Sequence, residues 1–274
     1  MVSQDEDSRV VVVGGGVMGS ALVRAIRAAG SHTVVVVEPD PGRTRALASI
    51  QGVTVQADLD VALSAEEPAQ VLLLAVKPHV VPSVLAQVAP GLAPQTLVVS
   101  VAAGVPLAVY EQALPPGTPV VRVMPNTPAL VGKGVAALTA GAAATEEHLA
   151  LAERLLAATG LVVRVAEPEL DAVTAVSGSG PAYAFYLIDA MAEAGVLLGL
   201  NRDLALRLAA ATVEGAGALV VRTGGHPAVL RERVSSPGGT TVAAVAELDS
   251  HGVRAGVVAA VRAAHARSVE LAQV

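Results

Sequence analysis

Several residue types are scarce in this chain of 274 residues, and each scarcity removes a class of function. The chain has no cysteine, which excludes disulfides, thiolate catalysis and cysteine-bound metals. Aromatic residues make up only 1% of the sequence, so stacking on nucleic-acid bases is nearly unavailable. The net charge is -6 and no basic block is visible, which argues against nucleic acid as a partner.

Lysine and histidine are limited as well. Lys77 and Lys133 are the only lysines, so an enzyme that needs a lysine acid or base has two candidates. No metal site is predicted, because the histidines lack the spacing of metal ligands. They are His32, His79, His148, His226, His251 and His265.

No membrane span or targeting segment is expected. Charged residues interrupt the long apolar stretches, as Arg207 and Glu214 do in the segment 202–221. The N-terminal segment 1–8 is polar and acidic, unlike a signal peptide. We therefore expect a cytoplasmic protein without a membrane partner.

The hydropathy pattern changes character along the chain. The first part has continuous β-branched or leucine runs, which are typical of a parallel sheet covered on both faces. These predicted strands are 9–13, 33–37, 71–76, 97–101 and 120–124. From about residue 167, alanine- and leucine-rich stretches predict long helices instead. These helices are 181–198, 202–221 and 253–271.

A glycine-rich turn directly follows the first predicted strand. Gly14, Gly16 and Gly19, with Val17 and Met18 between the last two, precede a predicted helix. In a dinucleotide site such glycines serve the tight turn, the approach of the pyrophosphate and the packing of helix on strand. We therefore predict an α/β N-terminal Rossmann-type doubly wound domain at 1–165, followed by an all-α C-terminal domain at 166–274.

The choice between NADH and NADPH is open at this level. Glu38 ends the second predicted strand, where a carboxylate accepts hydrogen bonds from ribose hydroxyls and repels a 2′-phosphate. Arg43 and Arg45 follow closely, and a guanidinium there either compensates a phosphate or is simply solvated.

Three further segments follow strands, on the ligand side of such a sheet. They are Ala75-Val76-Lys77-Pro78, the loop 100–104 with Ala102, Ala103 and Gly104, and the segment 122–128 with Asn126. Lys77 either steers a phosphate or ribose or is a surface lysine. The small residues of the second segment allow a nicotinamide ring to approach the backbone.

The most informative segment is Ser235-Ser236-Pro237-Gly238-Gly239-Thr240-Thr241. Proline and two glycines before a predicted helix expose consecutive backbone N–H groups, which suit a small anion such as a carboxylate. A cofactor site and an acid-binding site on one chain indicate a reductase or dehydrogenase.

Taken in order, these segments resemble the pyrroline-5-carboxylate reductase family, over nearly the whole chain. The resemblance implies reduction of 1-pyrroline-5-carboxylate to L-proline with NADPH or NADH. It implies that the substrate carboxylate rests on Ser236 to Thr240 and that the catalytic Thr241 hydroxyl faces the ring nitrogen. It places Lys77, Pro78 and Asn126 near the nicotinamide. It also implies that the helical domain forms a homodimer, often within a ring of dimers, which its apolar character independently favours.

Some residues depart from the family pattern, and other functions stay open. His79 stands where many members have glutamine, Glu38-Pro39 replaces residues that often favour NADPH, and Gly224 lies near where some relatives have a substrate-facing acid. The alternatives are a related imine reductase with another cyclic substrate, a β-hydroxyacid dehydrogenase-like enzyme, and a cofactor sensor without catalysis. For Thr241, a helix-capping role is the competing interpretation.

Overall fold

The computed structural model describes residues 8–30, 32–63 and 68–272. The polar N-terminal residues 1–7 lie outside this part of the chain. The described residues form two compact units. One unit extends to Gly178 and also includes the C-terminal residues from His265, and the other is Ser179–Ala264.

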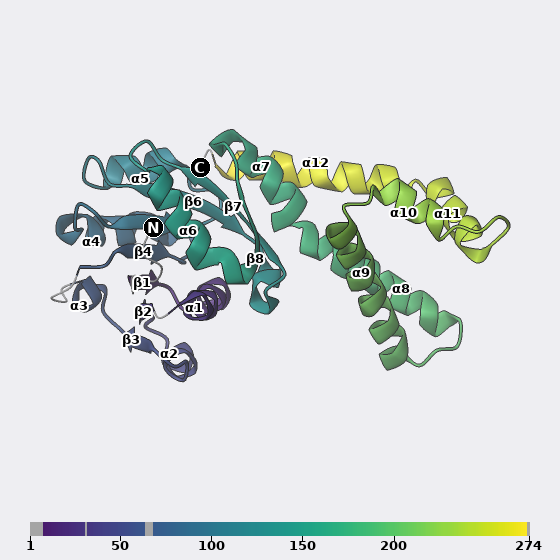
Figure 1. Ribbon diagram of the computed structural model, residues 1–274, viewed down its shortest axis with the longest axis horizontal. Coiled ribbons are helices and arrows are strands. Elements are labelled where there is room, and N and C mark those ends of the chain that lie inside the picture. Colours follow the sequence, from purple (N-terminus) through teal and green to yellow (C-terminus); the bar gives the residue numbers. More distant parts are fainter. Residues whose placement is uncertain (1–7, 31, 64–67, 273–274) are drawn as a thin grey trace. The chain divides into compact units, whose positions relative to one another are not determined.

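In the part of the chain that the structure describes, the first unit contains one sheet of eight strands in the order β3-β2-β1-β4-β5-β6-β7-β8 (Figure 1). The strands are β1 Arg9–Val13, β2 Thr33–Val37, β3 Val53–Gln56, β4 Val71–Leu74, β5 Leu97–Ser100, β6 Val120–Pro125, β7 Gly134–Ala140 and β8 Gly160–Arg164. Strands β1 to β6 pair in parallel, whereas β7 is antiparallel to β6 and parallel to β8. This topology confirms the predicted doubly wound domain.

Helices cover both faces of the sheet, because alternate residues of each strand point to opposite sides. On one face, Val10 packs in a buried cluster with Leu22 and Leu155. On the other face, Val11 packs in a second buried cluster with Leu85 and Tyr110. Burying each such side chain contributes about 1.5–3 kcal/mol. The helices of this unit are α1 Val17–Ala29, α2 Pro41–Ala48, α3 Leu59–Leu63, α4 Val81–Val88, α5 Leu107–Ala113, α6 Glu146–Leu156 and α7 Leu170–Val173.

The sequence pattern did not predict three of the strands. Strands β3 and β8 are short, and their residues are mostly half-buried or exposed rather than fully buried. Strand β7 is rich in alanine, which has little preference for strands, and it forms because β6 pairs with its backbone. The predicted strands 71–76 and 97–101 end earlier than expected, at Leu74 and Ser100.

The second unit is helical, as predicted, with α8 Gly180–Leu197, α9 Arg202–Thr223, α10 Pro227–Arg233, α11 Thr240–Ser250 and the first part of α12 Val253–Leu271. A short turn joins α8 to α9, and the Asn201 side chain caps α9 by accepting the Leu204 N–H at 2.9 Å. A Cβ at Gly195 would lie 3.0 Å from the Ala205 Cβ, so the glycine lets the two helices approach closely.

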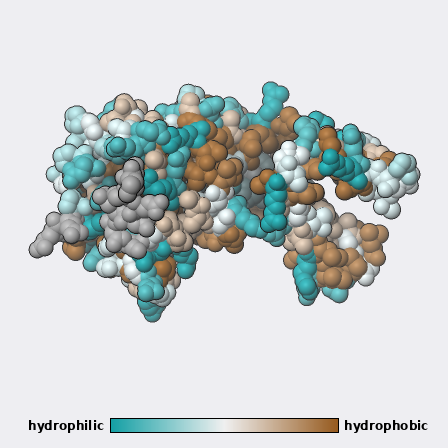
Figure 2. Space-filling model, in the orientation of Figure 1, coloured by the Kyte–Doolittle hydropathy of each residue, from teal (hydrophilic) through white to brown (hydrophobic). Residues whose placement is uncertain are grey.

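Large apolar side chains remain exposed in the second unit. Tyr186, Leu197 and Val221 are each more than 80% exposed, and Figure 2 shows apolar surface over α8 and α9. By length and composition alone, α9 is the one helix of the described residues that is apolar enough to cross a membrane. The expectation that charged residues, such as Arg207 and Glu214, leave no segment apolar enough was therefore wrong for α9, because an 18-residue window of this helix stays apolar despite them.

The last helix belongs to both units. Residues of α12 up to Ala264 are part of the second unit, and those from His265 are part of the first. The Ser268 hydroxyl donates a hydrogen bond of 2.6 Å to the Asp171 carboxylate, which anchors this end of the chain. The compact units thus divide at residue 178, and the boundary at 165/166 stays a prediction.

Candidate active site

The predicted cofactor residues of the first unit lie along one edge of the sheet. The pairing of Val13 with both Val37 and Leu74, and of Leu74 with Ser100, aligns the carboxyl ends of β2, β1, β4 and β5. The residues that follow these ends are Glu38, Gly14 to Gly19, Ala75 to Pro78 and Ala102 to Gly104. The order of strands reverses between β1 and β4, which is where doubly wound sheets bind ligands.

Each glycine of the turn has its own structural reason. Gly14 has φ +101, and a Cβ there would lie 2.7 Å from the Ala75 carbonyl oxygen. A Cβ at Gly19 would collide with the Gly14 carbonyl oxygen. A Cβ at Gly16, by contrast, would meet no described atom within 4 Å. Gly14 and Gly19 are therefore required by the fold, whereas Gly16 keeps a surface open.

The start of α1 fits an anionic ligand. Gly16 is the N-cap residue and offers no side-chain cap, and Val17 is 66% exposed. The N–H groups of Val17, Met18 and Gly19 belong to the first turn, where a helix supplies no carbonyl partners. Amides of this kind next to an open glycine suit the pyrophosphate of a dinucleotide.

Glu38 is buried at the end of β2 and is held on both oxygens. Its Oε2 accepts the Gly15 N–H at 2.7 Å, and its Oε1 accepts the Asp40 N–H at 2.9 Å. The Arg43 guanidinium lies 3.6 Å from Oε2 and is mostly exposed. The Arg45 side chain is exposed on α2.

The segments after β4 and β5 differ in exposure. Lys77 and Pro78 are exposed at the start of a short turn, and Ala75 and Val76 are half-buried. Ala103 is exposed, Gly104 is half-buried and has φ +76, and Ala102 is buried. The sheet edge therefore offers backbone and small side chains to a ligand here, with one cation nearby.

Asn126 follows β6 and is buried. Its side-chain oxygen accepts the Val135 N–H at 2.8 Å, and its side-chain nitrogen donates to the Ser177 carbonyl at 2.9 Å. The amide thus bridges β7 and the π-helical turn Thr174–Gly178. One N–H and one lone pair of the amide remain for a ligand, so its predicted contact with the cofactor stays a prediction.

A polar network near this edge was not predicted from the sequence. The Glu167 Oε1 atom accepts hydrogen bonds from Arg122 Nη1 at 2.9 Å and from the Leu107 N–H at 2.7 Å. The Tyr110 and Ser100 hydroxyls share a hydrogen bond of 2.6 Å. Burial raises the pKa of Tyr110, while the Ser100 bond and the Arg122 charge act in the opposite direction. An arginine inside the apolar strand 120–124 was the available signal for a buried carboxylate partner.

The predicted substrate residues lie in the second unit. The loop turns at Gly238, which has φ +69, and closes with a hydrogen bond of 2.9 Å from the Gly239 N–H to the Ser236 carbonyl. Helix α11 then begins at Thr240, with Gly239 as an N-cap residue without a side chain. Within the described residues the Thr241 hydroxyl has no hydrogen-bond partner, so the capping interpretation finds no support there.

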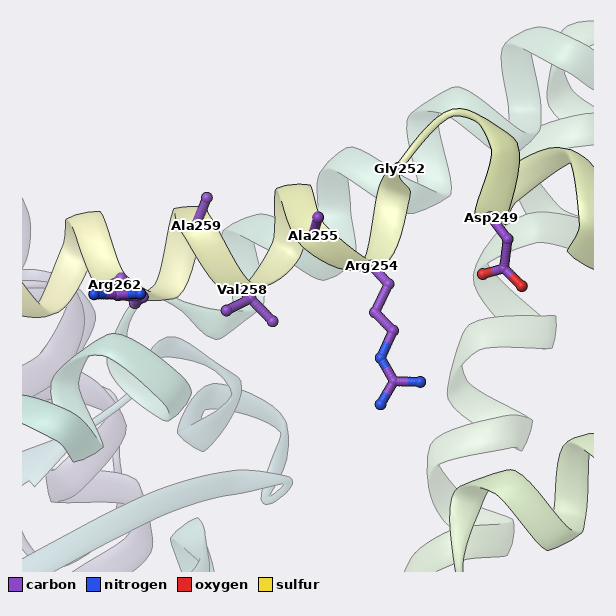
Figure 3. Close-up of a pocket in the computed structure, with 7 residues that line it drawn as sticks. All are labelled: Asp249, Gly252, Arg254, Ala255, Val258, Ala259 and Arg262. Carbon is purple, nitrogen blue, oxygen red and sulfur yellow. The ribbon is translucent and has the colours of Figure 1, made fainter.

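One hollow of the second unit is lined by other residues. A cavity of about 770 Å³ borders α12 and the turn before it, and includes none of the predicted substrate residues. Figure 3 shows Arg254 and Val258 on the same side of α12 and Asp249 at the end of α11. The described residues contain no cluster of three or more histidine, aspartate or glutamate side chains that would hold a metal.

Comparisons with known proteins connect both units to one group of enzymes. A family model described as pyrroline-5-carboxylate reductase dimerisation matches residues 167–271, and one described as NADP oxidoreductase, coenzyme F420-dependent, matches residues 9–104. A curated pyrroline-5-carboxylate reductase from Synechocystis is 44% identical over 263 residues, which is 95% of this chain and 97% of the relative. The chain belongs to the pyrroline-5-carboxylate reductase family.

Solved structures agree with this family. A pyrroline-5-carboxylate reductase from Coxiella burnetii has a TM-score of 0.88 at 34% identity, covering 97% of this chain and 99% of that one. A pyrroline carboxylate reductase from Plasmodium falciparum with NADP bound has a TM-score of 0.85 at 26% identity, covering 98% and 100%. As a family member, the chain is an oxidoreductase with a nicotinamide cofactor and an oligomerising helical domain.

Membership of the pyrroline-5-carboxylate reductase family also explains the exposed apolar surface of the second unit. The few fully buried apolar residues there include Ala192, Ala205 and Ala209, too small a core for so many large side chains. A dimerisation domain buries such surface against another subunit. A single chain of such a domain leaves apolar surface exposed, as on α8 and α9 here.

Proposed function

We propose that this chain catalyses the NAD(P)H-dependent reduction of 1-pyrroline-5-carboxylate to L-proline, the last step of proline biosynthesis. The observation that carries the proposal is the match to pyrroline-5-carboxylate reductases over 95% of the chain. The bound dihydronicotinamide supplies a hydride to the carbon of the substrate's C=N bond.

The first unit would hold the cofactor along the carboxyl edge of its sheet. The first-turn N–H groups of Val17, Met18 and Gly19 would bind the pyrophosphate, and open space at Gly16 admits it. Glu38 would take the adenosine ribose. Ala75 to Pro78, Ala102 to Gly104 and Asn126 would surround the nicotinamide end.

The loop before α11 would bind and orient the substrate. The backbone N–H groups of Gly238 and Thr240 would bind the substrate carboxylate at this helix start, with Ser236 beside it, while the Gly239 N–H closes the turn by donating to the Ser236 carbonyl. The protonated ring nitrogen would donate a hydrogen bond to the Thr241 hydroxyl, whose oxygen has no partner among the described residues. Because the imine arrives protonated, no strong general acid is required.

Two other reactions fit less well. A related imine reductase would need a different substrate at the same loop, and the comparisons favour pyrroline-5-carboxylate. A β-hydroxyacid dehydrogenase would use a helix-borne lysine in the second domain, and the sequence has no lysine after Lys133.

The assembly and location are part of the same proposal. Homodimers, arranged further as a ring of dimers, would cover the apolar surface of α8 and α9. The cytoplasm would be the location, with neither membrane nor nucleic acid as a partner. Light scattering should give a multiple of the 27.3 kDa chain mass at micromolar concentration.

Steady-state rates with pyrroline-5-carboxylate test the reaction, and Thr241→Ala tests the site. A hydrogen bond to a charged group contributes about 1.5–3 kcal/mol, so kcat should fall about 10- to 100-fold in this variant. The Kd for NADH or NADPH should stay within about twofold of wild type, because Thr241 is assigned to the substrate.

Thr54→Ala, at an exposed position in β3, is the matched control and should keep the wild-type kcat. Full activity of Thr241→Ala would remove this hydroxyl from the mechanism. Absence of proline formation by the wild type would refute the reaction itself.

A further inference from the structure

The buried carboxylate of Glu38 sits at the junction of the glycine turn and the start of α2. Only 4% of its side chain is exposed, although it ends a strand at the open edge of the sheet. The hydrogen bonds from the Gly15 and Asp40 N–H groups hold one oxygen of the carboxylate each. Its position is therefore set by backbone atoms before any ligand arrives.

Gly15 makes this arrangement possible. A Cβ at Gly15 would lie 3.1 Å from both Cγ and Oε2 of Glu38, and 2.5 Å from Cδ1 of Leu47. Leu47 is part of the buried core, where close packing opposes its displacement. A side chain at residue 15 would push the carboxylate out of its place. The middle glycine of Gly14-Gly15-Gly16 thus has a role that the dinucleotide fingerprint does not assign.

The carboxylate retains acceptor capacity for a ligand. A carboxylate has about four lone-pair positions, and the two amides use two of them. The remaining two suit the two vicinal hydroxyls of a ribose, which are donors. A 2′-phosphate offers no such donors when ionised and brings about two negative charges toward a fixed negative charge.

Arg43 does not reverse this preference. Its side chain is 58% exposed, and its guanidinium lies 3.6 Å from the Glu38 carboxylate, beyond hydrogen-bond distance but close enough for the two charges to attract. A 2′-phosphate would have to compete with Glu38 for Arg43, while Glu38 stays fixed by Gly15 and Asp40. Water screens an exposed arginine, whereas the carboxylate is buried.

We infer that Glu38, positioned by the N–H groups of Gly15 and Asp40, makes this enzyme select NADH over NADPH. The inference rests on the proposed function for the use of a nicotinamide cofactor, and it adds the residue that decides which one. Glu38 is the specificity-determining contact, and Gly15 is a positioning residue that acts through it.

Isothermal titration calorimetry of the full chain with NADH and with NADPH, without imine, tests the inference directly. The wild type should bind NADH at least about tenfold more tightly than NADPH, since the Glu38 carboxylate accepts hydrogen bonds from the two ribose hydroxyls of NADH and repels the 2′-phosphate of NADPH. Glu38→Ser should remove the preference, mainly by tightening NADPH. Gly15→Ala should also reduce the preference, because its methyl group would displace the Glu38 carboxylate without removing it.

Two variants serve as controls. Arg43→Ala should preserve or increase the preference for NADH, because it removes the only cation within 4 Å of the Glu38 carboxylate in the described structure. Glu147→Gln, at an exposed position on α6, should leave both Kd values unchanged. Thermal melting of each variant shows whether it is folded.

The outcomes separate this inference from the proposed reaction. Equal or tighter binding of NADPH by the wild type would overturn the role of Glu38, as would an unchanged ratio in folded Glu38→Ser. A clear NADH preference with no reduction of pyrroline-5-carboxylate would leave Glu38 in its role and overturn the substrate. Binding of neither dinucleotide would overturn both.

Discussion

Removing the Glu167 carboxylate should destabilise the first unit far more than removing a surface carboxylate. One oxygen of Glu167 accepts bonds from both Arg122 and the first turn of α5. The Arg122 side chain is 10% exposed and that of Glu167 is 33% exposed. Glu167→Ala therefore leaves a nearly buried guanidinium without its carboxylate and a helix N–H without its acceptor.

The expected size follows from these exposures. Breaking a fully buried ion pair by removing one partner costs about 3–5 kcal/mol, and exposed pairs contribute about 0–1 kcal/mol. With one partner a third exposed, we expect a loss of about 2–3 kcal/mol in the free energy of unfolding. Glu167→Gln keeps an oxygen acceptor, so it should lower the free energy of unfolding by only about 1 kcal/mol.

Urea unfolding followed by far-UV circular dichroism measures these losses, at one fixed protein concentration because the chain oligomerises. Glu270→Ala is the matched control, since Glu270 pairs with Arg267 on the surface at 2.8 Å, and its loss should stay below about 1 kcal/mol. Adding Arg122→Met to Glu167→Ala should recover part of the stability by removing the stranded charge. Equal unfolding midpoints for Glu167→Ala and Glu270→Ala would refute the reasoning.

Two further predictions concern residues beside the candidate site. Because burial raises the pKa of Tyr110 in the folded chain, its contribution to stability is complete below the unfolded pKa of 10.0 and is lost as the pH rises through the folded pKa. Urea midpoints should therefore fall more steeply above pH 10.0 for the wild type than for Tyr110→Phe, and parallel curves would contradict this assignment. Gly16→Ala should unfold within about 0.5 kcal/mol of wild type yet bind NADH at least about tenfold more weakly, because only a ligand would meet its methyl group. Gly19→Ala should lower the free energy of unfolding by several kcal/mol or fail to fold, since its methyl group collides with the Gly14 carbonyl. Normal stability of Gly19→Ala, or unchanged NADH binding by Gly16→Ala, would contradict these roles of the two glycines.

The parts of the fold that could be predicted are those where one physical cause dominates. The run from Arg9 to Val13 is buried on both faces, so its composition alone indicated a parallel strand, and the structure has the same bounds. The helix Val253–Leu271 was likewise predicted with its exact ends. Strand β7 was missed because its alanines carry little strand preference, and only the pairing with β6 makes it a strand.

The candidate site shows the same division. The order of glycines and the acid at Glu38 follow from local sequence spacing. The hydrogen bonds from the Gly15 and Asp40 N–H groups to the Glu38 carboxylate depend on how β1 and β2 lie together, and a local sequence pattern does not show that arrangement. Asn126 was expected beside the cofactor, and its amide also bonds Val135 and, 51 positions further along the chain than Asn126 itself, Ser177.

The bond between Ser268 and Asp171 limits how this enzyme can be dissected. The end of α12 packs with the sheet-bearing unit, although it is encoded after the entire helical unit. A fragment that stops at Ala264 would lack residues 265–272, which pack with the sheet-bearing unit. A separately expressed helical unit that ends with the chain would contain these residues without the sheet on which they pack. Truncations and fusions meant to isolate either half should therefore be designed as circular permutants that keep residues 265–272 with the sheet.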